Sequence, residues 1–232
     1  MITLGIDLSS QPDDTAACMI DWHNDGRAIA RSATLHCDDA TLDDLIRKAD
    51  AIGIDAPFGW PEAFVEAVGQ WNAITWDDHA FQKKLRVRLT DQFVHATTRL
   101  TPLSVSTDRI ALPAMRAMAL LARHGVTDRS GDGRFFEVYP AGSLKRWNLD
   151  HQKYKKKENL PKRRGLLAQL RAALPGLSAG EAYADTDHAF DALIASLTTH
   201  AAATGKTLVA PADQHGVASR EGWIHLPVTR PV

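Results

Sequence analysis

The sequence predicts an α/β fold with a mixed central sheet of five strands and flanking helices. Alternating, β-rich segments at residues 2–8, 15–22 and 27–36 predict a meander of three strands. A helix then leads into an apolar strand at 51–55, and a connection through a helix places that strand parallel to an earlier one. A fifth β-rich segment, 135–139, follows a long helical stretch.

Each element has local signals. Asp38 and Asp39 cap a short helix that runs to Lys48. Prolines 57 and 61 end the fourth strand, and Pro140 ends the fifth. A helical region is expected over 62–124, with breaks at Pro102 and Pro113 and its clearest helix at 114–123. Two further helices are expected at about 161–174 and 186–204, and a last extended piece at 222–227.

Length and composition indicate one globular domain. A chain of 232 residues can bury one core, so we expect a single domain over 1–232 with a helical insertion at about 62–130. No apolar stretch approaches the length of a membrane span, and the N-terminus lacks the pattern of a secretory signal. Cys18 and Cys37 lack metal-ligand spacing and read as reduced thiols. These features predict a cytoplasmic protein without a membrane partner.

Charge is distributed unevenly. Residues 145–164 contain nine basic and two acidic residues, whereas the first sixty residues hold eleven aspartates and four basic residues. An acidic site beside a basic strip suits a phosphodiester substrate, with metals at the scissile phosphate and cations along the backbone. A solvated surface is the alternative explanation of the strip.

Two aspartates occupy equivalent positions. Asp7 and Asp55 each end an apolar run, Leu-Gly-Ile-Asp and Ile-Gly-Ile-Asp. If the two strands are parallel neighbours, both carboxylates stand at the sheet edge where α/β folds hold ligands. Keeping both ionised requires a divalent cation, and oxygen ligands suit Mg²⁺ or Mn²⁺. Each aspartate could instead cap a turn.

Further acids lie in unfavourable surroundings. Glu137 is placed inside a strand, where an inward carboxylate needs a partner, although it could face water. Asp191 lies in an apolar helix, and Asp187 and His188 share its face. That face could supply the last metal ligands, or Asp187 and His188 could be ordinary surface residues.

Seven blocks together resemble the DUF429 family of predicted RNase H-like nucleases, which is similar to RuvC-type resolvases. They occur in order across nearly the whole chain: Ile6-Asp7, residues 54–61, Arg88-Leu89-Thr90-Asp91, Glu137-Val138-Tyr139-Pro140, Tyr154-Lys155, Asp191-Ala192-Leu193 and residues 221–224. The resemblance implies an RNase H-like fold, with Asp7, Asp55 and Asp191 as ligands of two Mg²⁺ or Mn²⁺ ions. His188 stands where the superfamily commonly has another aspartate, which leaves its role open.

The resemblance implies hydrolysis of DNA or RNA by two metal ions. Glu137 is then a further ligand or supporting acid, and Arg88, Lys155 and Arg164 are candidates to hold phosphates of the substrate. Trp60, Trp76 and Tyr154 could stack on unpaired bases, or belong to the core. A phosphotransferase or phosphatase of the actin-like kinase superfamily and a non-catalytic nucleic-acid binder are the alternatives. The sequence leaves open whether the chain forms a homodimer.

Overall fold

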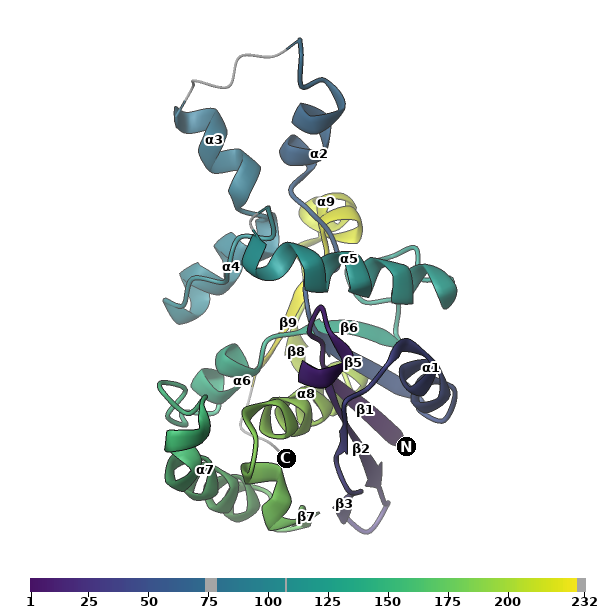
Figure 1. Ribbon diagram of the computed structural model, residues 1–232, viewed down its shortest axis with the longest axis vertical. Coiled ribbons are helices and arrows are strands. Elements are labelled where there is room, and N and C mark those ends of the chain that lie inside the picture. The colour runs from purple at the N-terminus through teal and green to yellow at the C-terminus, as the bar shows by residue number, and fades with distance from the viewer. Residues whose placement is uncertain (74–78, 107, 229–232) are drawn as a thin grey trace.

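The computed structural model describes residues 1–73, 79–106 and 108–228 (Figure 1). Within them, nine strands form one mixed sheet. The strands are β1 (Ile2–Asp7), β2 (Ala16–Trp22), β3 (Ala28–Ala30), β4 (Thr34–Leu35), β5 (Ala51–Asp55), β6 (Phe135–Val138), β7 (Leu177–Ser178), β8 (Thr207–Leu208) and β9 (Ile224–Pro227). Their order is β7-β3-β2-β1-β5-β6-β9-β8, and β4 also pairs with β2.

The five expected strands form the centre of this sheet, in the order β3-β2-β1-β5-β6. β2 runs antiparallel to β1 and β3, whereas β5 is parallel to β1 and β6 is parallel to β5. The sequence predicted one strand over 27–36, but β3 and β4 divide it. Their pairing registers with β2 differ by one residue, as at a β-bulge, which explains the interruption. β7, β8 and β9 widen the expected five-stranded sheet.

Helices flank the sheet. They are α1 (Asp39–Arg47), α2 (Glu62–Gly69), α3 (His79–Arg86), α4 (Leu89–Thr98), α5 (Asp108–Arg123), α6 (Pro140–Arg146), α7 (Leu160–Ala173), α8 (Asp187–Ala203) and α9 (His215–Glu221), with 3₁₀ turns at Pro12–Asp14, Lys157–Asn159, Glu181–Ala184 and Ala212–Gln214. Of these helices, α2 and α3 project away from the sheet (Figure 1). Asp38 caps α1 by accepting from Thr41 N. The expected break at Pro113 is wrong, because Pro113 lies inside α5.

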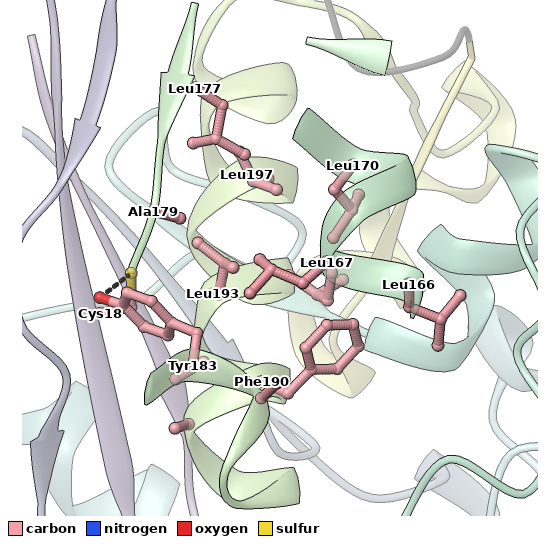
Figure 2. Packing of buried hydrophobic residues seen from close by; sticks show 14 of the residues in the cluster. Cys18, Leu166, Leu167, Leu170, Leu177, Ala179, Tyr183, Phe190, Leu193 and Leu197 are labelled. Carbon is pink, nitrogen blue, oxygen red and sulfur yellow. Dashed lines mark hydrogen bonds between the residues drawn. The ribbon is translucent and has the colours of Figure 1, made fainter. Parts of the chain in front are cut away.

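Two apolar layers hold the helices on the sheet. On one face, Leu4, Ile6 and Ile54 pack with buried residues of α1 and α5. On the other, α8 lies between the sheet and α7. Figure 2 shows Phe190, Leu193 and Leu197 of α8 beside the leucines of α7, and the Tyr183 hydroxyl, which donates to the buried Cys18 Sγ. Burying both faces gives the sheet a fixed register, which positions the residues at its edge.

A helical arm leaves the body after β5. Figure 1 shows α2 and α3 projecting away from the sheet. The buried Glu221 carboxylate ties the arm to the body, because its Oε1 accepts from Glu62 N at 2.8 Å and its Oε2 accepts from Leu89 N at 2.7 Å. One side chain therefore holds the first turns of α2 and α4. None of the described helices is long and apolar enough to cross a membrane.

Candidate active site

Asp7 and Asp55 meet at the edge of the sheet. Each is the last residue of its strand, and the parallel register of β1 and β5 pairs them directly. The preceding residues of both strands are buried, so the apolar runs fix the strand ends in place. Both aspartates are only partly buried and can meet a ligand from solution.

Two glycines allow α8 to lie on these strands. Gly5 and Gly53 are also paired residues of β1 and β5. A Cβ added to Gly5 would be 2.1 Å from Ser196 N and 2.2 Å from Ala192 O, and one added to Gly53 would be 1.9 Å from Thr199 Oγ1. The backbone of α8 therefore lies against the strands where they have no side chains. The sequence carried a signal for this contact, since Gly-Ile-Asp occurs in both strands.

Asp191 completes an acidic cluster. It lies in the second turn of α8, is fully buried, and follows a helix start at which Thr186 Oγ1 accepts from Ala189 N. Oxygen atoms of Asp7, Asp55 and Asp191 all lie within 4.8 Å of one another. The structure thus brings together three of the acids singled out in the sequence.

Electrostatics make this cluster unfavourable without a cation. Burial raises the pKa of Asp7 to about 6, with repulsion from Asp191 adding to the effect and the hydrogen bond from His188 opposing it. Burial and then repulsion from Asp7 raise the pKa of Asp55 well above its usual range. A divalent cation would relieve both effects, and carboxylate oxygens are its preferred ligands. The three residues therefore fit Mg²⁺ or Mn²⁺ chemically.

Three side chains surround the acids. His188 Nδ1 lies 2.7 Å from Asp7 Oδ2, and this contact raises the pKa of His188. The Tyr154 hydroxyl donates to Asp191 Oδ1 at 2.7 Å, and Lys155 Nζ lies 2.7 Å from Asp191 Oδ2. Tyr154 is buried, which agrees with the second of the two alternatives expected for it, a place in the core.

Glu137 and Arg88 form a separate buried pair. Glu137 accepts from Arg88 Nη1 and Nη2 and from Phe58 N, so its carboxylate is held beside the loop that follows Asp55. Arg88 uses its remaining donors on Asp91 and on the Glu221 carbonyl. This corrects the expectation for Arg88, which has no donor left for a substrate phosphate. Glu137 pairs with Arg88 and lies outside the cluster of three acids, which agrees with the second of the two roles expected for it, that of a supporting acid.

The basic segment is less uniform than the sequence suggested. Arg163 is buried and donates to the carbonyls of Tyr154, Lys156, Ala184 and Asp185. It therefore connects the loop carrying Lys155 to the start of α8. Charge composition could not reveal this role, because a structural arginine and a surface arginine look alike in sequence.

The other candidates lie around the cluster. Asp187 accepts from Lys156 N, so the structure uses it to hold a loop. Arg164 is exposed and lies 4.0 Å from Asp185. Trp60 is partly exposed on the loop after β5, and Trp76 falls outside the described residues.

A mixed sheet in the order β3-β2-β1-β5-β6, with β2 reversed and acids at the ends of β1 and β5, defines an α/β protein with the RNase H-like fold. The chain matches the family described as "Protein of unknown function (DUF429)" over residues 5–216, and it belongs to that family. No curated protein matches the chain. Among solved structures, the chain is similar to Thermus thermophilus RuvC, with 12% identity, 88% of this chain and 97% of that chain covered, and a TM-score of 0.39.

Proposed function

We propose that this protein is a metal-dependent nuclease that hydrolyses phosphodiester bonds of DNA or RNA. The observation that supports this most is the cluster of Asp7, Asp55 and Asp191 within 4.8 Å at one sheet edge. Such a set of oxygen donors suits hard divalent cations, and cation-assisted hydrolysis is the chemistry for which nucleases use clustered carboxylates.

The residues of the site would have different roles in hydrolysis. Two Mg²⁺ or Mn²⁺ ions, when bound, would activate a water molecule and neutralise the leaving oxygen in an in-line displacement. Asp7, Asp55 and Asp191 would supply the oxygen ligands that hold these ions. His188 holds Asp7 Oδ2 through Nδ1 and, with 39% of its side chain exposed, offers Nε2 for proton transfer to solvent.

Exposed cations beside the site suit a polyanionic substrate. Lys153, Lys156 and Lys157 are exposed on the loop that carries Lys155, and in the described part of the chain none of the three lies in an ion pair. Arg164 is exposed on the adjoining helix α7. These side chains could neutralise several phosphates outside the scissile bond, which predicts binding that weakens steeply with salt.

The test is cleavage of labelled single-stranded, duplex and four-way-junction DNA and RNA with Mn²⁺ or Mg²⁺. We expect metal-dependent cutting by the wild type and by the exposed control Asp213→Asn, and loss of cutting in Asp7→Asn and Asp191→Asn. A folded, metal-binding protein that cuts no member of the panel would contradict the proposal. ATP turnover by the same samples would instead favour the phosphotransferase alternative.

A further inference from the structure

Lys155 makes an ion pair with the most deeply buried acid of the cluster. Its Nζ lies 2.7 Å from Asp191 Oδ2, while 56% of the lysine side chain stays exposed. Asp191 Oδ1 is already occupied by the Tyr154 hydroxyl. The ammonium is therefore the exposed partner of a buried carboxylate.

Hydrogen bonds hold the loop that carries Lys155 in place. Arg163 Nη1 donates to the carbonyls of Tyr154 and Lys156, which are the two neighbours of Lys155 in the chain. Lys156 has a φ of +73°, a strained conformation for a residue with a side chain, and its N–H donates to Asp187 Oδ2. Hydrogen bonds on both sides of Lys155, of which the one to the Tyr154 carbonyl is buried, stabilise this conformation, so the fold specifies the backbone position of Lys155.

We propose that Lys155 is a built-in counter-ion that occupies a cation position at Asp191 and competes there with a divalent metal ion. In the absence of metal, its single charge offsets part of the repulsion among three carboxylates. When a cation binds Asp191 Oδ2, the ammonium leaves this oxygen and becomes available to a phosphate of the substrate. The inference rests on the proposed metal-dependent function and adds a competition between lysine and metal to it.

Competition between Lys155 and the metal ion predicts that removing the lysine side chain raises the affinity for the metal. Removing a side chain that merely supports the site would weaken metal binding, whereas removing a competitor strengthens it. The ion pair is half exposed, and such pairs contribute up to about 1 kcal/mol, which corresponds to roughly fivefold in affinity.

The experiment is calorimetric titration of the metal-free protein with Mn²⁺. We expect Lys155→Met to bind Mn²⁺ about fivefold more tightly than the wild type, and Lys155→Arg to stay within about twofold of it. Lys157→Met removes the same charge two residues away without the contact to Asp191, and it should also stay within about twofold. Equal or weaker binding by Lys155→Met, or an equal gain in Lys157→Met, would overturn the inference.

A second measurement follows the ammonium itself. An amine-reactive reagent should modify Lys155 more slowly than Lys157 in metal-free protein, and Mn²⁺ should accelerate modification of Lys155 alone. If Lys155 reacts at the same rate with and without bound Mn²⁺, the ammonium does not leave, and the inference fails while the proposed nuclease stands. If no sample binds Mn²⁺, both fail.

Discussion

Asp7 and Asp55 are direct partners in the parallel register of β1 and β5, so two carboxylates end adjacent strands side by side. Asp191 approaches both from α8. Burial raises the pKa values of Asp7 and Asp55, and repulsion from Asp191 on Asp7 and from Asp7 on Asp55 adds to the effect, so the metal-free protein carries an electrostatic cost at neutral pH. A divalent cation held by these carboxylates would offset that cost.

Replacing Asp55 by asparagine should stabilise the metal-free protein. Asparagine keeps the shape and removes one repelling charge, so we expect a gain of roughly 1–2 kcal/mol in the free energy of unfolding at pH 8. Urea denaturation with a chelator measures it. The same variant should lose the stabilisation that Mn²⁺ gives the wild type. Asp213→Asn, an exposed change outside the site, should show neither effect, and a destabilised Asp55→Asn would contradict the electrostatic account.

Stability should also depend on pH through Asp7. Its pKa is about 6 in the folded protein, against about 4 in an unfolded chain. Between these values the folded state keeps a proton that the unfolded state has released, so the free energy of unfolding falls as pH rises. The advantage of metal-free Asp7→Asn over the wild type should therefore grow from pH 4 to 6 and level off above it. Urea denaturation across this range measures the difference, and a difference independent of pH would exclude Asp7 as the source.

The glycine beneath α8 should be intolerant of a side chain. In Gly5→Ala, the new Cβ would overlap the backbone of Ser196 and Ala192, which forces α8 away from β1. We expect a loss of about 3 kcal/mol or more in the free energy of unfolding and weaker Mn²⁺ binding, since Asp191 moves with the helix. Gly69→Ala is the matched control, because a Cβ there meets nothing within 4 Å. Thermal denaturation and calorimetry compare the two variants, and a stable, metal-binding Gly5→Ala would contradict the expected contact.

Arg88 should matter for folding and not for substrate binding. Arg88→Met leaves Glu137 and Asp91 buried without their shared cation, which should cost about 3–5 kcal/mol. Arg86→Met, an exposed arginine two residues earlier, should change stability by less than about 0.5 kcal/mol. Urea denaturation distinguishes them. Weaker nucleic-acid binding by a fully stable Arg88→Met would restore Arg88 as a substrate ligand.

The features that the sequence predicts correctly are those marked by neighbouring residues in the chain. Asp7 and Asp55 could be paired because each ends an apolar run, and Asp191 was conspicuous in an apolar helix. The roles of Arg88 and Arg163 could not be predicted, since each depends on partners distant in the chain or on backbone carbonyls that any residue supplies. The short strands β7 and β8 were missed for a similar reason, because two residues carry no periodicity.

The two oxygens of the Glu221 carboxylate accept hydrogen bonds from Glu62 N, where the arm begins, and from Leu89 N, where the chain returns to the body. A segment whose ends are held this close loses little additional entropy when it grows longer, so the part of the arm between Ala67 and Leu85 can be lengthened, shortened or exchanged while Glu62, Arg88 and Leu89 keep their contacts. The arm departs from the strand that carries Asp55. Evolution or a protein engineer could thus place different arms beside the same three carboxylates, and under the proposed function such arms would change which nucleic acids reach them.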